Sequence, residues 1–364
     1  MKKLLSSALL VLLASISLAA FPQVSWADDG PAFESLGRKD AVVIANRGSG
    51  TISVIDVGRD EVIGTFDLPA GPNPPEPMYV VYSPFRHRVF VGDRANDQVV
   101  VFRAWDFSIE ATVPAGAGVF HMWDGLRSRQ LWVNNDVDKT TTVIDPRTLE
   151  VLATVPTPAD LVADGGKPHD VILDPAKPYA YITVLGLPGP DDYVVKFSTR
   201  TFQEVDRAAV GKDPHLSLTA RNRLLYVPCQ GSDAVFVLDR YTMDVVKEID
   251  VPGAHGAGMT LNGKTFYTTN LPGGGSDGLF AIDTRVNAVV GNPVDTPYPV
   301  PHNIVLTPRG QKLFLTHSGA TANKVTIYDV RRPDPTPILA EEVTVGKNPF
   351  GLDYVPFAGM GVGR

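Results

Sequence analysis

The sequence predicts an all-β fold, a seven-bladed β-propeller with four antiparallel strands in each blade. Two observations carry this prediction. A short β-rich segment recurs seven times at intervals of 41 to 49 residues, starting at Val42, Val89, Leu131, Ala180, Leu225, Phe266 and Leu313. Each copy contains further strand patterns and no helical pattern. A fixed period of roughly 40 to 50 residues is typical of radial or stacked repeats, and four strands per unit indicate a propeller blade.

Each repeat supplies its strands in the same order. A polar turn follows the recurring segment, and then a strand with period-two alternation and many β-branched residues. A third strand comes next, for example at 62–68, 150–155 and 245–251, and a Gly/Pro-rich loop leads to a fourth, for example at 170–173 and 303–306. The alternating strands are expected at 52–56, 99–103, 142–145, 194–198, 235–239, 279–283 and 325–329.

The last strand predicts how the ring closes. Residues 350–356 read as a first strand that has no later strands of its own. By elimination they must join 42–46, 52–56 and 62–68 in one mixed blade, which removes the open sheet edges that would otherwise invite aggregation.

The N-terminus has the pattern of a bacterial secretory signal peptide. Lys2 and Lys3 precede an apolar run, and two small-x-small sites follow, of which we take the second and place cleavage after Ala27. A lead-in at 28–40, the propeller at 41–357 and a tail at 358–364 remain. An uncleaved anchor helix is the alternative. Since no later stretch approaches the length of a membrane span, we expect a periplasmic or secreted chain with no span after cleavage.

Composition excludes several classes of site. The single Cys excludes a disulfide framework, a Cys-rich zinc site, a four-Cys iron-sulfur cluster and c-type haem attachment. A formal net charge of −7 argues against nucleic acid as the partner. The sequence also lacks a phosphate-binding loop and a Gly-x-Ser-x-Gly elbow, so nucleophilic hydrolase chemistry has no motif.

Five of the seven histidines occupy what reads as one position of the repeat, directly before the first strand of a blade. If the first strands line the central channel, these imidazoles converge at the channel mouth on one face, here called the top face. Met78 and Phe350 hold the same position in the other two blades. Two explanations stay open: a histidine inherited with the repeat that bonds neighbouring loops, and a transition-metal site. The five are His121, His169, His215, His255 and His302.

Five other residues are accessory candidates near the mouth. His317 and Cys229 both end a second strand and so face the top; His317 is a candidate additional ligand, and Cys229 is either a ligand or a small buried thiol. Met78 is a candidate axial ligand or a plug of the channel. Asp170 and Asp124 lie just inside the mouth and are the candidates for proton transfer.

Cationic residues in the top loops suggest a funnel for a small anionic ligand on a protein of negative net charge. Solvated loop charges are the alternative reading. The candidates are Lys167, Lys212, Lys347, Arg47 and Arg94.

The repeat resembles a known family. The segments 42–46 and 52–56, together with Gly166-Lys167-Pro168-His169 and Gly211-Lys212-Asp213-Pro214-His215, resemble the YVTN-type β-propeller repeat. The resemblance implies the propeller fold and leaves the function open, since relatives include the propeller domains of nitrous oxide reductase and cytochrome cd-type nitrite reductase.

These observations predict a ligand-binding propeller in which the mouth histidines hold a transition metal. Copper is the first candidate, because imidazole nitrogens suit it, the Irving–Williams order favours it, and the resemblance to nitrous oxide reductase implies it. The chemistry we expect from such a site is the redox conversion of a small anion. A haem-type cofactor is the weaker alternative, because only Phe120, Trp123, Tyr298 and Phe350 offer apolar walls near the mouth. The competing class is a non-enzymatic scaffold that binds a periplasmic protein or cell-envelope partner.

Overall fold

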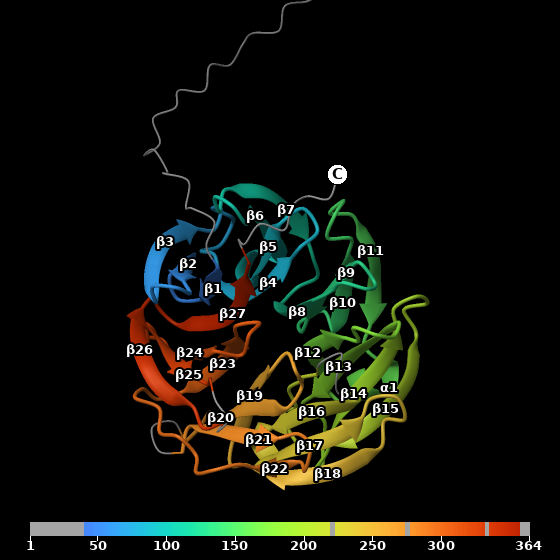
Figure 1. Cartoon of the computed structure of the whole chain (residues 1–364). Coiled ribbons are helices and arrows are strands. Elements are labelled where there is room, and N and C mark those ends of the chain that lie inside the picture. Colours follow the sequence, from blue (N-terminus) through green and yellow to red (C-terminus); the bar gives the residue numbers. More distant parts are fainter. Residues whose placement is uncertain (1–39, 219–222, 274–276, 332–334, 357–364) are drawn as a thin grey trace, which may run out of the picture. The chain divides into compact units, whose positions relative to one another are not determined.

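The computed structural model describes residues 40–218, 223–273, 277–331 and 335–356. Within them, seven antiparallel sheets follow one another around a central axis (Figure 1), as the repeat predicts. The expected signal peptide at 1–27, nearly all of the lead-in and the tail at 358–364 lie outside the described residues. None of the helices in the described ranges has the length and hydrophobicity needed to cross a membrane.

Six blades have four strands, and blades are numbered here from the sheet that contains β1. Blade 1 is β27 (Pro349–Val355), β1 (Ala41–Asn46), β2 (Thr51–Asp56) and β3 (Glu61–Asp67). Blade 2 is β4 (Pro77–Ser83), β5 (Arg88–Asp93), β6 (Gln98–Arg103) and β7 (Ile109–Pro114). Blade 3 is β8 (Val119–Gly125), β9 (Gln130–Asn135), β10 (Thr140–Ile144) and β11 (Val151–Pro156). Blade 4 is β12 (Lys167–Leu173), β13 (Tyr179–Leu185), β14 (Asp192–Ser198) and β15 (Glu204–Val210).

The remaining blades follow in the same order. Blade 5 is β16 (Leu224–Cys229), β17 (Ala234–Asp239) and β18 (Val245–Asp250), its first strand being reduced to isolated bridges. Blade 6 is β19 (Ala254–Met259), β20 (Thr265–Asn270), β21 (Leu279–Asp283) and β22 (Ala288–Val289). Blade 7 is β23 (Pro301–Leu306), β24 (Lys312–His317), β25 (Lys324–Asp329) and β26 (Ile338–Thr344). Short helices lie in the loops: η1 (Arg94–Asn96), α1 (Ala159–Ala163) and η2 (Gln230–Ser232).

The ring closes as the sequence predicts. β27 pairs antiparallel with β1, and the strand order of this sheet is β27-β1-β2-β3. In Figure 1 the red β27 accordingly lies beside the blue β1, so the first and last strands of the propeller share one blade.

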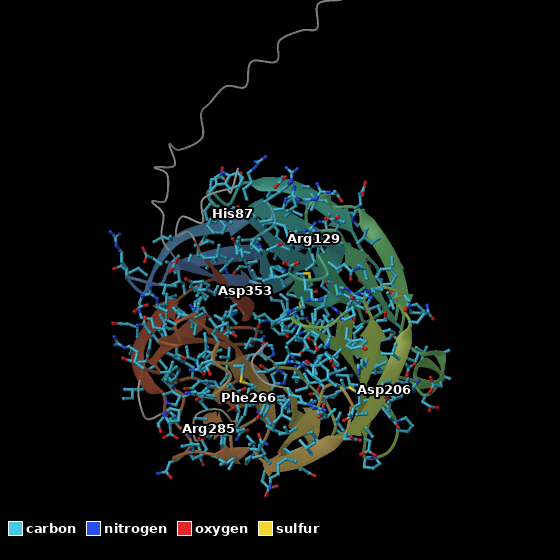
Figure 2. All side chains as sticks on the ribbon, turned by 45° about the vertical axis from the view of Figure 1, so that its right-hand side comes forward. His87, Arg129, Asp206, Phe266, Arg285 and Asp353 are labelled. Carbon is cyan, nitrogen blue, oxygen red and sulfur yellow. The ribbon has the colours of Figure 1, made fainter. Side chains whose placement is uncertain are left out.

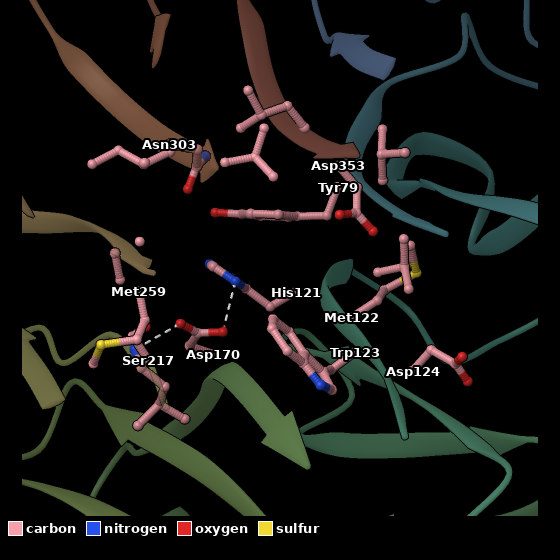
Figure 3. Close-up of a pocket in the computed structure, with 18 of the residues that line it drawn as sticks. Tyr79, His121, Met122, Trp123, Asp124, Asp170, Ser217, Met259, Asn303 and Asp353 are labelled. Atoms are coloured by element: carbon pink, nitrogen blue, oxygen red, sulfur yellow. Dashed lines mark hydrogen bonds and ion pairs between the residues drawn. The ribbon is translucent and has the colours of Figure 1, made fainter. Parts of the chain in front are cut away.

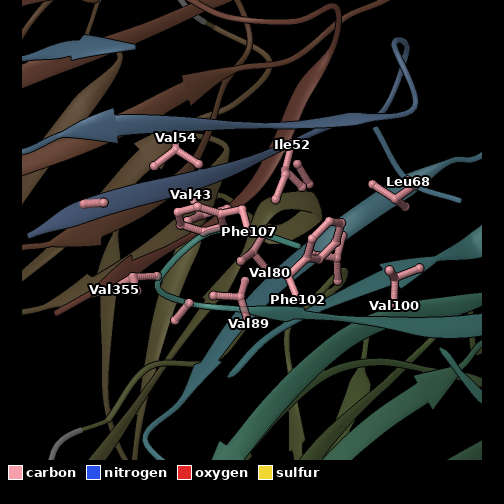
Figure 4. Packing of buried hydrophobic residues seen from close by; sticks show 14 residues of the cluster. Val43, Ile52, Val54, Leu68, Val80, Val89, Val100, Phe102, Phe107 and Val355 are labelled. Atoms are coloured by element: carbon pink, nitrogen blue, oxygen red, sulfur yellow. The ribbon is translucent and has the colours of Figure 1, made fainter. Parts of the chain in front are cut away.

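The core consists of layers between blades. Strands β1 and β2 are buried at every residue, whereas the outer β3 is largely exposed or half-buried. A middle strand is covered on both faces because each blade packs against two neighbours, so both residue sets of the alternation are buried. One apolar cluster fills each of the seven interfaces; Figure 4 shows the cluster between blades 1 and 2, where Val43 and Val54 meet Val89 and Phe102.

Candidate functional site

A β-bulge marks the start of the first strand in six blades. In β12, the partners Pro168↔Val184 and Val171↔Ile182 leave two residues, His169 and Asp170, opposite one, Thr183. The same register shift occurs in β4, β8, β19, β23 and β27. A bulge re-aims side chains and ends regular pairing. In β12 it therefore sets His169 and Asp170 at the same level of the channel.

The bulge corrects one predicted register. In β8, the two residues opposite Asn134 are Phe120 and His121. Phe120 is therefore the equivalent of His169, His255 and His302, while His121 is the equivalent of Asp170. The sequence comparison misplaced His121 by one residue because a bulge, unlike a regular strand, lets either of two adjacent residues face the axis.

Three threonines hold the bulges in place. The backbone N–H of the second bulge residue has no partner among the regular hydrogen bonds between the two strands. A hydroxyl group on the opposing strand accepts its hydrogen bond instead. Asp170 N–H donates to Thr183 Oγ1 at 2.8 Å and Gly256 N–H to Thr269 Oγ1 at 2.8 Å. Asn303 N–H donates to Thr316 Oγ1 at 3.1 Å.

The structure brings the five predicted histidines together. They form a closed circuit of rings around the axis, completed by Phe350 of blade 1 and Tyr79 of blade 2, so that every blade contributes a ring to the circuit; Phe120 of blade 3 packs against it as a second ring. The centroid distances are His121–His169 5.0 Å, His169–His215 4.8 Å, His215–His255 3.8 Å, His255–His302 4.7 Å, His302–Phe350 4.2 Å, Phe350–Tyr79 5.5 Å and Tyr79–His121 3.7 Å.

Asp170 orients one member of this histidine cluster. Its Oδ1 lies 2.9 Å from His121 Nδ1, and its Oδ2 accepts the Leu216 N–H at 2.9 Å (Figure 3). A carboxylate only accepts when ionised, so His121 donates from Nδ1 and leaves the lone pair of Nε2 directed elsewhere. Such a carboxylate–histidine pair is the arrangement that fixes the tautomer of a metal-ligating imidazole.

Burial lowers the pKa of four of the five imidazoles and so keeps these four neutral. It lowers the pKa of His169, His215 and His255 well below the usual value for histidine, and the charges of the neighbouring imidazoles lower it further. Burial also lowers the pKa of His302 to about 3, with smaller effects of His121 and Arg47. Neutral imidazole is the form that binds a metal ion.

Several nitrogen atoms of the cluster are buried without a hydrogen-bond partner. They are Nε2 of His121, His169 and His215 and both ring nitrogens of His255. A buried polar atom that lacks a partner costs roughly 1–3 kcal/mol. By contrast, His302 Nδ1 accepts a hydrogen bond from the Asn303 amide at 2.9 Å.

The donor set fits a metal ion. One ligand atom from each of His121, His169 and His215 lies within 4.8 Å of the other two. Two nitrogens at ~2.1 Å from one ion are at most ~4.2 Å apart, so small ring rotations would bring them into range. A second group of this kind consists of Asp213, His215 and His255.

Asp213 is a site residue that sequence reasoning missed. Its Oδ1 lies 3.8 Å from His169 Nε2 and 3.9 Å from His215 Nε2, and its side chain is 39% exposed. Burial raises its pKa, as does the charge of Asp192. One sequence feature could have revealed Asp213: the segment Gly211-Lys212-Asp213-Pro214-His215 has one residue more than the equivalent Gly166-Lys167-Pro168-His169. It inserts a carboxylate, in the left-handed conformation at φ 57°, beside the cluster.

Two other predicted residues lie apart from the cluster. His317 uses both ring nitrogens in the fold, donating from Nδ1 to the Pro299 carbonyl at 3.3 Å and accepting at Nε2 from Thr326 at 2.9 Å. Cys229 is fully buried, and burial raises the pKa of its thiol well above the usual range.

Met78 and Asp124 also have surroundings that differ from the predicted ones. Met78 is fully buried in the apolar cluster between blades 2 and 3, a position that is neither that of a ligand in the histidine cluster nor that of a plug in the channel. Asp124 lies beyond Met122 on β8, further along the channel than the histidines, and lines a cavity there.

Carboxylates pair with four of the five funnel cations. Arg47 is 2.5 Å from Glu76, Arg94 is 2.8 Å from Asp136, and Lys167 is 3.3 Å from the same Asp136. Lys212 is 2.8 Å from Asp192. These pairs reduce the net positive field that the predicted funnel requires. The sequence did not reveal them because each partner comes from another loop.

Comparisons with known proteins agree with the fold. The family described as "Lactonase, 7-bladed beta-propeller" matches residues 15–252. No curated protein matches the chain.

Among solved structures, the periplasmic gluconolactonase PpgL of Pseudomonas aeruginosa matches with a TM-score of 0.66 and 16% identity, over 87% of this chain and 99% of that one. Dihydro-haem d1 dehydrogenase NirN, solved in complex with DHE, matches with a TM-score of 0.61 and 15% identity, over 90% and 77%. Hydrazine synthase of Kuenenia stuttgartiensis matches with a TM-score of 0.62 and 16% identity, over 75% and 87%.

At these identities the structures share the fold, and their activities do not transfer with it. The family match covers well over half of the chain and agrees with the seven observed blades. The chain therefore belongs to the family of seven-bladed β-propellers described as lactonases.

Proposed function

We propose that this propeller binds a first-row transition-metal ion, copper being the first candidate, through His121, His169 and His215. His255 and His302 lie next in the circuit of rings and complete the nitrogen-rich surroundings. The observation that carries the proposal is the set of buried imidazole nitrogens without partners, which a metal ion would satisfy. The inherited-histidine alternative leaves these atoms unsatisfied.

The residues around the cluster have distinct tasks in this proposal. Asp170 holds the Nδ1 side of the His121 ring, which would leave Nε2 available to bind the ion. Tyr79 and Phe350 close the circuit of rings around the axis. Asp213, on the more exposed side, is placed to accept or deliver a proton beside His169. The ion would supply Lewis acidity or one-electron chemistry.

The family match favours one reaction as a second candidate, the hydrolysis of a lactone to its hydroxy acid. Water adds across the ester bond, and the product carries a carboxylate and a free hydroxyl group. The ester carbonyl would need an electrophile, and a metal ion held by His121, His169 and His215 would supply one. A small anion remains the other candidate substrate. It would compete with the carboxylates that pair with Arg47, Arg94, Lys167 and Lys212, or it would bind near Lys347.

A haem-type cofactor would use His169, because His169 is half-buried whereas the other four histidines of the cluster are buried.

Metal analysis tests the proposal. The chain is exported from cells grown with copper, purified, and its metal content measured together with its melting temperature. We expect about one ion per wild-type chain, loss of the ion in the double variant His169→Ala plus His215→Ala, and retention in His87→Ala, a histidine outside the cluster. A metal-free wild type whose melting is unchanged by added copper would instead favour a scaffold for a periplasmic protein partner.

A lactonase assay separates the two chemistries. Hydrolysis of gluconolactone is followed for wild type, with and without a chelator, and for the same double variant. Metal-dependent hydrolysis that the double variant lacks would support the second candidate. Hydrolysis that persists without metal would move the reaction away from the histidine cluster.

We also propose export to the periplasm or secretion, with YVTN-type repeats forming the mature protein. Support comes from Lys2, Lys3 and the apolar run that follows them. Edman sequencing of the exported chain is expected to start at Asp28. Retention of residues 1–27 on a membrane-bound chain would point to the anchor-helix alternative.

A further inference from the structure

A cavity extends along the channel from the histidine cluster toward the face opposite the top. It has a volume of about 530 Å³, which is in the usual range of small-molecule sites. His121, His215 and His255 line one end of it, and residues at or beyond the far ends of the first strands, such as Pro84 and Leu126, line the other. Two of the proposed metal ligands, His121 and His215, therefore form part of the wall at one end of this cavity.

Apolar side chains make most of its wall. They come from the first strands of several blades and from the corresponding segment of blade 5, so the wall surrounds the axis. Trp123 and Leu126, which are 41% and 61% exposed, lie toward the open end and leave an apolar edge in contact with solvent. The aliphatic wall residues include Val80, Met122, Leu216, Met259, Ile304 and Leu352.

The formal charges in this wall are all of one sign. Among the described residues that line the cavity, the only formally charged ones are Asp124, Asp170 and Asp353, with no Lys, Arg or Glu. Asp170 is already engaged by His121 and by the Leu216 N–H. Asp124 and Asp353 remain, and Figure 3 shows both on the side of the cavity opposite Met259 and Ser217.

These two carboxyl groups differ in how they are held. Asp353 accepts the backbone N–H of Tyr82 at 2.7 Å and of Tyr354 at 2.8 Å, which fixes its position on β27. Both carboxylate oxygens of Asp124 are buried, and the neighbouring group that favours its ionised form is the neutral hydroxyl of Ser83. A buried carboxylate without a cationic partner is costly, so Asp124 points to a ligand that supplies a positive charge.

We propose that this cavity binds a small organic cation with an apolar body, such as a quaternary or tertiary ammonium compound. Asp124 and Asp353 supply the opposite charge, and Trp123, Tyr79 and Tyr82 supply aromatic rings that attract a cation on their faces. The aliphatic wall takes the apolar body of the ligand. A neutral hydrophobic ligand leaves the acidic groups unexplained, and an anion meets like charge. The site shares His121 and His215 with the proposed metal site at one end, but its charged groups, Asp124 and Asp353, are not part of the histidine cluster, so it does not depend on a bound metal.

Protonation competes with the cation. Burial raises the pKa of Asp124 to about 7, an effect that Asp353 increases and Ser83 reduces. Burial likewise raises the pKa of Asp353 to about 6. A permanently charged ligand should therefore bind more tightly at pH 8 than at pH 5. The other titratable groups on the cavity wall are Asp170, Tyr79, Tyr82, His121, His215 and His255.

Calorimetry with three probes of similar shape tests the proposal on the wild-type chain, with EDTA present to keep the metal site empty. The probes are phenyltrimethylammonium, its neutral isostere tert-butylbenzene, and benzoate. We expect 1:1 binding of the ammonium at pH 8, at least tenfold tighter than either other probe, and at least a tenfold loss of affinity at pH 5. Equal or tighter binding of the neutral or anionic probe, or no binding of the ammonium, would overturn the proposal.

Variants assign the charge. Asp124→Asn keeps the shape of the side chain and should weaken ammonium binding at least tenfold at pH 8, with a smaller dependence on pH. The matched control is Asp206→Asn, on the outer strand β15 at the rim of the ring (Figure 2), which should bind as wild type does. Equal affinities of Asp124→Asn and wild type would overturn the role of Asp124. The comparison of probes on the wild type stands even if a variant fails to fold.

Discussion

At the scale of single residues, the contact between Asp170 and His121 decides what the histidine cluster can do. One carboxylate oxygen faces His121 Nδ1 at 2.9 Å, and the other is 3.9 Å from His215 Nδ1. The same side chain thus lies next to two members of the first proposed ligand group. Without the charge of Asp170 both rings would stay in place, but nothing would fix which nitrogen of His121 carries the proton.

Asp170→Asn should accordingly weaken metal binding by about 10- to 100-fold, as is typical when the hydrogen-bond partner of a ligand is lost. Copper affinity measured by competition with a chelator checks this, and Asp206→Asn serves as the exposed control. A variant with wild-type affinity would show that Asp170 has only a structural task.

The depressed histidine pKa values predict acid sensitivity of the metal-free fold. His302 has a pKa of about 3 in the folded state against about 6.5 when unfolded. Between these values the unfolded chain binds a proton that the folded chain does not, so stability falls as the pH falls. From pH 7 to pH 5 this single group should contribute a loss of roughly 2 kcal/mol.

His302→Phe tests this contribution, since Phe120 and Phe350 occupy the equivalent position in other blades. Urea unfolding of the metal-free proteins at pH 7 and pH 5 should show a smaller loss of stability in the variant than in wild type. An equal loss in both would mean that His302 is protonated in the folded state or does not titrate in this range.

At the scale of strands, the β-bulge places the side chains of the candidate site. It sets Asp170 beside His169, and it sets Asn303, whose amide bonds the ring of His302, in the equivalent place in blade 7. Period-two alternation and the turns between strands predicted nearly all of the strands. They did not predict the bulges, because an extra residue on one strand leaves the pattern of its neighbour unchanged. For this reason the position of His121 was wrong by one residue while its location near the axis was right.

Thr183 provides the test at this scale. Thr183→Val keeps the shape of the side chain and removes the acceptor of the Asp170 N–H, which should cost roughly 1–2 kcal/mol of stability. It should also weaken metal binding, because the bulge holds His169 and Asp170. Thr183→Ser keeps the hydroxyl and should retain most of both properties. Urea unfolding and copper titration measure the two effects, and unchanged values in Thr183→Val would refute the role of this hydrogen bond.

At the scale of the whole propeller, seven apolar layers and one closing strand act together. Each layer joins neighbouring blades, and the layer between blades 7 and 1 includes Leu352 of β27 together with Ile44 and Phe314. Counting strands along the sequence was enough to predict how the ring closes. It could not predict the ion pairs of the top loops or the acidic wall of the cavity, because these depend on which side chains of separate blades face each other.

A chain that ends at Lys347 lacks β27 and should lose cooperative folding of the entire ring, since the edge of β1 and one side of two layers become exposed. A chain that ends at Pro356 retains β27 and is the control. Circular dichroism and gel filtration compare them. A soluble chain ending at Lys347 with a cooperative transition like that of the control would contradict the closure argument.

In the proposed site, blades 3, 4 and 5 place His121, His169 and His215 around one metal ion. X-ray absorption spectroscopy of the copper-loaded wild type can test this arrangement, because imidazole ligands give a characteristic scattering pattern. We expect at least three imidazole nitrogens at ~2 Å from copper, and loss of that pattern in the double variant His169→Ala plus His215→Ala. Copper bound by oxygen ligands alone, or a spectrum that the double variant leaves unchanged, would contradict it.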